Sequence, residues 1–381
     1  MPEFVTSTVE HAGGFPIHDM MMRYNVFVPR LYNWCKSLGF TPGKIMPSRA
    51  FCSDESQGYP IIMIAKHFGT FPFNHGVVGG IVATDRHGPH AAHGQDMLIM
   101  QASHVGYDPE NRVFGTYRRA QTTQMECSSS CGKIHQVISW YKNEYDFARQ
   151  NILLHNEDGQ KIIIVDNQLL RRDRDNSLLL RLEKLIATDT GGQPAPLKIL
   201  STAKVYSPAQ EFVDRMGEMA FNGITPQSIG AHLTADMFYY QRDIPQMEEG
   251  AHHLEHNLIN FMPQIVTSNS SSLLAAQITA QIEFDRTFRT SVKEHAYKGK
   301  KVLFIAGLNI DISPRPDQLF PLTKFVPWAA YIQDGDGYYF TLEQDELVQT
   351  LQQQSNDNPD QIDLEDAIRM MASAEEIKID Q

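Results

Sequence analysis

The chain has 381 residues, of which 42% are hydrophobic and 20% are charged, with a formal net charge of −12. Nucleic-acid binding needs clustered positive charge, so an acidic chain with short, scattered groups of Lys and Arg is expected to have no nucleic-acid partner. No apolar run approaches the ~18 residues of a membrane-spanning helix, and the start of the chain lacks the basic and apolar segments of a secretory signal. We therefore expect a cytoplasmic protein that does not bind membranes.

The helical spacing of apolar residues is clearest in the first part of the chain. Residues 18–39 predict a helix that ends at Gly39, with Pro29 as a site for a kink. The apolar segment 59–68 is typical of a helix start or a buried strand. Residues 71–95 are rich in Gly, His, Pro and Asn and indicate a long irregular connection.

Further elements follow before the strongest boundary signal. Residues 97–106 predict a buried strand that emerges at His104, and residues 128–150 predict a helix entered through serines, which are good N-caps. Residues 175–189 resemble a charged helix, and the Pro/Gly cluster GGQPAP follows at 191–196. The predicted organisation is a first domain at 1–196, an α+β C-terminal region at 197–352 with strands at 198–206 and 300–310, and a polar acidic tail at 353–381, where an amphipathic helix is expected.

Three residues form a candidate metal site. Cys52 follows a strand-like stretch, His104 ends an apolar strand, and Cys131 opens a helix, whose N-terminus favours a thiolate. Two thiolates and an imidazole suit zinc with a fourth position left open, and such wide spacing fits ligands from separate strand ends of an α/β sheet. The alternative is that each is an ordinary buried Cys or a structural His. Spacing alone does not decide between these interpretations.

Five short motifs occur in a specific order: LGFTPGK (38–44), CSDE (52–55), SHVGYD (103–108), RRAQ (118–121) and SSSCGKIHQVISWYKNEY (128–145). In order and character they resemble the LCIB family, the limiting-CO2-inducible B/C proteins related to β-class carbonic anhydrases. The resemblance covers about half of the chain. It implies an α/β fold, a β-carbonic anhydrase-like domain with a mainly parallel central sheet flanked by helices, and a homodimer.

The resemblance also implies roles for individual residues. Cys52, His104 and Cys131 match the family's zinc ligands, and Asp54 matches the acid that orients a metal-bound hydroxide. The common β-class pattern Cys-x-Asp-x-Arg is broken here, because position 56 is Ser. An arginine from elsewhere, Arg118 or Arg119, is then expected to hold Asp54 away from the metal.

The implied reaction is the reversible hydration of CO2 to bicarbonate by a zinc-bound hydroxide, with these small molecules as the binding partners. A proton relay is also required, and a histidine that titrates near neutral pH is the natural candidate. His93 is the residue we select from a group of five histidines close to the ligands in sequence, the others being His75, His87, His90 and His135.

Three alternative functions remain open. The first is a catalytically silent zinc-binding scaffold of the same family. The second is a thiol enzyme with Cys131 as nucleophile and a histidine as base. The third is a zinc peptidase, because residues 252–256 (HHLEH) satisfy the pattern H-x-x-E-H, with His252 and His256 on one helix face and Glu255 as base. A match of three specified positions is weak in a chain with 15 histidines, and an exposed or interfacial His-rich helix is the favoured explanation of it.

Overall fold

The computed structural model describes residues 11–82, 96–118, 127–171, 177–242, 251–291, 294–315, 318 and 321–375. The chain forms two compact units. Unit 1 comprises Met1–Lys133 and Ala276–Gln381, and unit 2 comprises Ile134–Ala275. The predicted boundary at residue 196 thus falls inside unit 2, because strands from the C-terminal part of the chain complete the sheet of unit 1.

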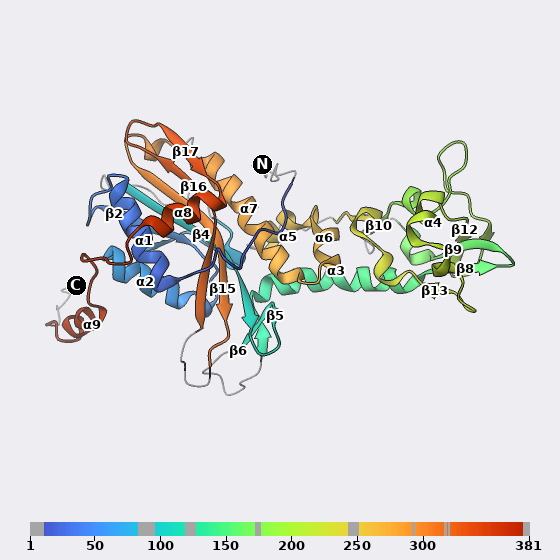
Figure 1. The fold of residues 1–381 in the computed structure, drawn as a ribbon, viewed down its shortest axis with the longest axis horizontal. Coiled ribbons are helices and arrows are strands. Elements are labelled where there is room, and N and C mark those ends of the chain that lie inside the picture. Colours follow the sequence, from blue (N-terminus) through green and yellow to red (C-terminus); the bar gives the residue numbers. More distant parts are fainter. Residues whose placement is uncertain are drawn as a thin grey trace, which may run out of the picture. The chain divides into compact units, whose positions relative to one another are not determined.

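The centre of unit 1 is a mixed sheet with the order β1-β16-β15-β4-β2-β3 (Figure 1). Its strands are β1 (Met22–Arg23), β16 (Leu322–Gln333), β15 (Val302–Ile312), β4 (Asp96–Asp108), β2 (Ile45–Ala50) and β3 (Phe73–Asn74). Strands β15, β4, β2 and β3 are parallel, whereas β16 and β1 are antiparallel to their neighbours. Two short strands extend the sheet, β17 (Tyr339–Leu342) on β16 and β5 (Val113–Phe114) on β4, and β6 (Thr116–Arg118) pairs with β7 (Cys127–Ser129). The largely parallel α/β sheet predicted from the sequence is therefore present.

Helices cover both faces of this sheet, as the alternation of side chains along β4 requires. Leu98 and Met100 belong to a core formed with three helices that lie together in Figure 1, α1 (Tyr24–Ser37), α2 (Gly58–Phe68) and α8 (Gln344–Gln353). Met97 and Ile99 point to the other face, where Phe284 of α7 (Ser271–Ser291) packs. Odd and even positions of β4 are thus both buried, which explains its continuous apolar sequence.

Most helices predicted in unit 1 are confirmed. The helix expected at 18–39 is α1, which contains Pro29, and the segment 59–68 is the helix α2. The terminal amphipathic helix is α9 (Leu364–Ala372), capped by Asp363. Short 3-10 helices occur at η1 (Glu55–Gln57), η2 (Val78–Gly80) and η9 (His295–Tyr297).

Unit 2 is built on an antiparallel sheet with the order β11-β12-β9-β8-β13. Its strands are β11 (Lys198–Ile199), β12 (Ala203–Tyr206), β9 (Gln160–Asp166), β8 (Ile152–Glu157) and β13 (Gln227–Ser228). Its helices are α4 (Gln210–Met216), α5 (Ala251–Ile259), α6 (Met262–Thr267) and most of α3 (Gly132–Asn151), which confirms the helix predicted at 128–150. The described part of unit 2 also contains the 3-10 turns η4 (Asn167–Leu170), η6 (Glu218–Phe221), η7 (Gly230–His232) and η8 (Ala235–Met237).

Two predictions for unit 2 are wrong. The helix expected at 175–189 is, in its described part, the strand β10 (Leu178–Leu180) followed by the 3-10 turn η5 (Leu182–Lys184). Leu178–Leu180 instead pair with the distant strand β14 (Phe238–Tyr240), and this pairing overrides the local helical pattern. The single strand expected at 198–206 is a hairpin of β11 and β12.

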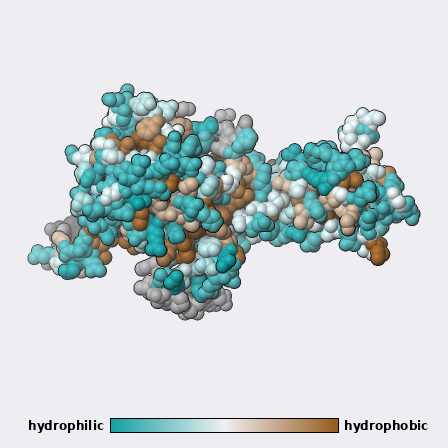
Figure 2. Space-filling model, in the orientation of Figure 1, coloured by the Kyte–Doolittle hydropathy of each residue, from teal (hydrophilic) through white to brown (hydrophobic). Residues whose placement is uncertain are grey.

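The surface seen in Figure 2 is mainly hydrophilic, with smaller apolar areas between the polar ones. Among the helices that the structure describes, none is both long enough and apolar enough to cross a lipid bilayer.

Candidate metal centre

The three residues singled out by the sequence lie together in unit 1. Cys52 follows the end of β2, His104 lies on the neighbouring parallel strand β4, and Cys131 directly precedes α3. All three are buried, their ligand atoms lie within 4.8 Å of one another, and the two sulfur atoms are 3.8 Å apart. Within the described ranges, this is the group of three or more Cys, His, Asp or Glu residues that can hold a metal ion.

The two nitrogens of His104 have different environments. Nδ1 lies 2.8 Å from Oδ2 of Asp311, whereas Nε2 is buried and makes no hydrogen bond. Leaving a buried polar atom without a partner costs about 1–3 kcal/mol. A metal ion between Nε2 and the two thiols would satisfy it, so the residues present fit zinc.

The titration of these groups is dominated by their mutual contacts. Burial lowers the pKa of His104, but the hydrogen bond to Asp311 and the neighbouring sulfurs of Cys131 and Cys52 raise that pKa well above its ordinary value. The hydrogen bond from Cys131, and then His104, lowers the pKa of Cys52 to about 3 against the effect of burial. The same bond to Cys52, together with burial, raises the pKa of Cys131 to about 12. These directions favour a Cys52 thiolate beside a protonated His104, so a cation bound by all three residues would release the protons of His104 and Cys131.

Asp311 of β15 is the main partner of the cluster, and the sequence reasoning missed it. Besides His104, it accepts hydrogen bonds from Ser56 Oγ at 2.8 Å, Gln57 Nε2 at 2.9 Å and Thr323 Oγ1 at 2.9 Å. Four donors converge on its two oxygens, which fixes the carboxylate toward Nδ1 of His104. A carboxylate behind a metal-binding histidine sets the orientation and tautomer of the ring.

The hydrogen bonds continue from Gln57 to the first helix. Asn309 Nδ2 donates to Gln57 Oε1 at 2.6 Å, and the hydroxyl of Tyr24 donates to Asn309 Oδ1 at 2.7 Å. Asn309 is the partner of His104 in the register of β15 and β4. Two buried residues outside the ligand set, Asn309 and Tyr24, therefore hold Gln57 in position against Asp311.

Asp54 and Ser56 belong to the short turn η1 after Cys52. Asp54 caps this turn by accepting the backbone N–H of Ser56 at 3.2 Å. Burial raises the pKa of Asp54 to about 6, an effect that the nearby His104 partly opposes. Ser56 is only 1% exposed, and its hydroxyl faces Asp311 rather than Asp54. The residue that replaces the arginine of the β-class pattern is thus part of the support of His104.

The other predicted catalytic residues are not brought to the cluster by any contact seen here. The guanidinium of Arg118 donates to Glu110 at 2.9 Å, a partner other than the predicted Asp54. Arg119 and His93 lie outside the described residues. Cys127 is exposed, and its sulfur lies 3.6 Å from Asp108, apart from the ligand cluster.

Of the remaining candidate histidines, His87 and His90 lie outside the described residues, and His135 is exposed on α3. His75 is buried beside Ser48, with 2.6 Å between Nδ1 and Oγ. Burial lowers the pKa of His75 to about 4, which does not suit a relay at neutral pH.

The HHLEH segment lies on α5, where Glu255 has partners of its own within unit 2. It accepts hydrogen bonds from the Tyr141 hydroxyl and from Arg242, both at 2.6 Å. Arg242 also stacks over the Trp140 ring, 4.0 Å from its centroid. These contacts explain Glu255 as a structural residue and do not favour its use as a general base. The side chain of His252 lies outside the described part of the chain.

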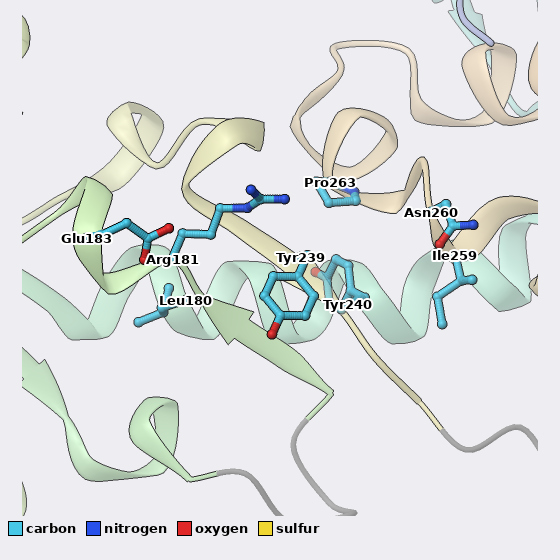
Figure 3. Close-up of a pocket in the computed structure, with 8 residues that line it drawn as sticks. All are labelled: Leu180, Arg181, Glu183, Tyr239, Tyr240, Ile259, Asn260 and Pro263. Atoms are coloured by element: carbon cyan, nitrogen blue, oxygen red, sulfur yellow. The ribbon is translucent and has the colours of Figure 1, made fainter. Parts of the chain in front are cut away.

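Unit 2 also has a surface hollow of about 500 Å³ between β14 and the segment joining α5 to α6 (Figure 3). The Arg181 guanidinium lies over the Tyr239 ring, 5.6 Å from its centroid, and Glu183, Asn260 and Pro263 complete the lining. The hollow therefore offers an aromatic face and two opposite charges, and none of its lining residues belongs to the Cys/His cluster.

Comparison with known proteins agrees with the fold. The profile of the limiting CO2-inducible proteins B/C, beta carbonic anhydrases, matches residues 21–188. The crystal structure of PtLCIB4, a homolog of the limiting CO2-inducible protein LCIB, has a TM-score of 0.50 at 10% identity and covers 86% of this chain and 95% of its own. That of LCIB itself has a TM-score of 0.45 at 11% identity and covers 85% and 95%. No curated protein matches the sequence significantly. Residues 21–188 thus match the LCIB family of carbonic anhydrase-like proteins, in agreement with the resemblance of the sequence motifs.

Proposed function

We propose that unit 1 is a zinc-dependent carbonic anhydrase that interconverts CO2 and bicarbonate. The observation that carries the proposal is the buried cluster of Cys52, His104 and Cys131, in which Nε2 of His104 has no hydrogen-bond partner. The match of residues 21–188 to the LCIB family supports the same function. The expected homodimer and cytoplasmic location belong to this proposal as well.

The donor set suits the proposed ion. Two sulfurs and one nitrogen are soft ligands, and three protein ligands leave a fourth position for water or substrate. When bound, zinc lowers the pKa of water into the neutral range and polarises the oxygen atoms of substrate. The protein contributes the geometry, because Asp311 holds the ring of His104 and the Gly79 N–H bonds to the sulfur of Cys52 at 3.1 Å.

Asp54 is the residue we assign to proton handling. Hydration of one CO2 by one water yields bicarbonate and one proton, so a base must accept that proton near the cluster. Asp54 follows Cys52 by two residues, its pKa is raised to about 6, and the Ser56 N–H fixes one of its oxygens. A carboxyl with this pKa can take up and release a proton close to neutral pH.

A zinc-binding scaffold without turnover is the second candidate. It is favoured by Ser56, because a serine hydroxyl directed at Asp311 does not hold Asp54 as the β-class arginine would. If Asp54 coordinated the metal, it would fill the fourth position and stop catalysis. Zinc content would then be normal while CO2 hydration was absent.

The test combines zinc quantification with stopped-flow CO2 hydration. The wild-type chain should carry one zinc and hydrate CO2, and Cys131→Ala should lose both. Cys127→Ala is the matched control, because this exposed thiol lies outside the cluster and its loss should change neither. A wild-type chain without zinc, or Cys131→Ala with full zinc, would overturn the metal site.

Asp54→Asn separates the two candidates from each other. It should keep its zinc and lose about 100-fold or more in hydration rate if Asp54 handles the proton. Wild-type protein that binds zinc but does not hydrate CO2 supports the scaffold instead.

A further inference from the structure

The segment that follows β3 and contains η2 forms a tight loop against the candidate metal cluster. We call residues 76–82 the thiolate loop, because the N–H of Gly79 donates to the sulfur of Cys52 at 3.1 Å. The loop closes on itself through a bridge between Gly76 and Val82 and a hydrogen bond from Val77 N to Ile81 O at 3.0 Å. Its conformation therefore decides where the Gly79 N–H points.

Two glycines let this loop lie directly on the strands that carry the ligands. Gly80 has φ +78, and a Cβ there would lie 2.3 Å from the carbonyl oxygen of Ala102, two residues before His104. A Cβ on Gly76 would lie 2.5 Å from the carbonyl oxygen of Phe51, the residue before Cys52. The loop is thus in backbone contact with the segments that carry two of the three ligands.

An ion pair on α7 holds the other end of the loop. Glu283 is completely buried and accepts the N–H of Val82 at 2.8 Å. Arg286 donates to Glu283 at 2.6 Å and also to the carbonyl oxygen of Val82 at 2.5 Å. Both polar groups of one peptide residue are therefore bound by a charged pair one turn apart on a helix.

Burying the charge of Glu283 is a costly way to gain stability, because its removal from water offsets much of its attraction to the partly exposed Arg286. Such a pair is useful where it fixes one conformation. Here it contacts the backbone of Val82, three residues after the Gly79 N–H that touches Cys52.

We propose that Glu283 and Arg286 are positioning residues of the metal centre, which lock the thiolate loop so that the Gly79 N–H stays hydrogen-bonded to the Cys52 sulfur. This inference rests on the proposed zinc site. An N–H donor on a thiolate withdraws charge from the sulfur, and in a buried site that effect is strong. Loss of an outer partner of a metal ligand typically weakens metal binding 10–100-fold.

The test measures zinc affinity by chelator competition in the full chain carrying Glu283→Gln. Zinc binding should weaken at least ~10-fold. Cobalt-substituted protein adds a readout of the sulfur itself, because the sulfur-to-cobalt charge-transfer absorption should shift when the N–H donor is displaced. Arg289→Gln is the matched control, since Arg289 forms an exposed ion pair with Asp285 on the same helix. It should change neither quantity.

Folded Glu283→Gln protein with unchanged affinity and unchanged absorption would overturn the inference. If Glu283→Gln does not fold, Arg286→Lys decides, because it keeps the charge but replaces the planar guanidinium that reaches both Glu283 and Val82. Weaker zinc binding and a shifted sulfur-to-cobalt absorption are then expected of Arg286→Lys, and a folded variant that shows neither would also overturn the inference. A wild-type chain that binds no zinc defeats the proposed function, whereas normal wild-type zinc with an unaffected variant defeats this inference alone.

Discussion

Asp311→Asn isolates the contribution of the carboxylate behind His104. The side chain is fully buried, and asparagine has nearly the same shape, so the change removes charge without opening a cavity. In the native chain the carboxylate accepts from His104, Ser56, Gln57 and Thr323. The substitution should therefore weaken zinc binding and lower the free energy of unfolding.

The size of the effect follows from counting donors. An asparagine has one acceptor oxygen, and its amide group must face donors that previously met the second carboxylate oxygen. His104 Nδ1 and the Ser56 hydroxyl bond to Oδ2, and the Thr323 hydroxyl bonds to Oδ1, so whichever oxygen is replaced by the amide group, at least one donor loses its acceptor. Each buried unpaired donor costs about 1–3 kcal/mol. For the metal, we expect 10–100-fold weaker binding, or about 1.4–2.7 kcal/mol.

The assay is chelator competition for zinc, with circular dichroism and chemical unfolding on the same samples. Asp285→Asn serves as the control, because it removes a carboxylate from an ion pair that is partly exposed on α7. The control should keep the zinc affinity of the wild-type chain. Folded Asp311→Asn protein with wild-type zinc affinity would refute the view that this carboxylate fixes His104 as a ligand.

Three further predictions use other parts of the chain. Gly80→Ala should destabilise unit 1 by more than Gly43→Ala in a chemical unfolding experiment. Both glycines lie in unit 1 and have positive φ, which costs about 1–2 kcal/mol for alanine, but of the two only the Cβ at Gly80 meets a backbone atom, at 2.3 Å. The neutral form of His75 is favoured by burial, with a pKa of about 4, so its contribution to stability is intact above pH ~6.5 and falls by up to about 3 kcal/mol as the pH drops toward 4. His75→Gln should remove that part of the acid sensitivity, and an unchanged pH dependence would contradict it. His256→Ala should leave the zinc content unchanged, and loss of zinc would instead support a metal site on α5.

The sequence was informative wherever local pattern and burial agree. The strand of β4 is recognisable because both of its faces are covered, which makes its residues uniformly apolar up to the polar group at His104. The candidate ligands Cys52 and Cys131 lie after the end of a strand and before the start of a helix, positions with recognisable sequence signals. The register of the LCIB motifs joined these separate signals into one predicted site.

Long-range pairing explains what local patterns could not give. Leu178–Leu180 look helical in their own segment but form β10, because Phe238–Tyr240 supply a partner strand some sixty residues later. In the same way, β15 and β16 return from the C-terminal part to finish the first sheet. A Pro/Gly cluster indicates a turn but not a domain boundary. The pairing of β10, before residues 191–196, with β14, after them, shows that this turn lies inside unit 2.

The support of His104 had a visible signal in the sequence. In the strand VLFIAGLNIDI, the polar residues Asn309 and Asp311 interrupt an apolar run at positions two apart, so they share one face of β15. Polar residues are tolerated in a buried strand when they have hydrogen-bond partners. Here the partners are Gln57, Ser56 and His104. Ser56 therefore does more than mark a missing arginine. Its small hydroxyl fits beside Asp311 in a fully buried network, and the sequence departs from the β-class pattern at the residue that touches this carboxylate.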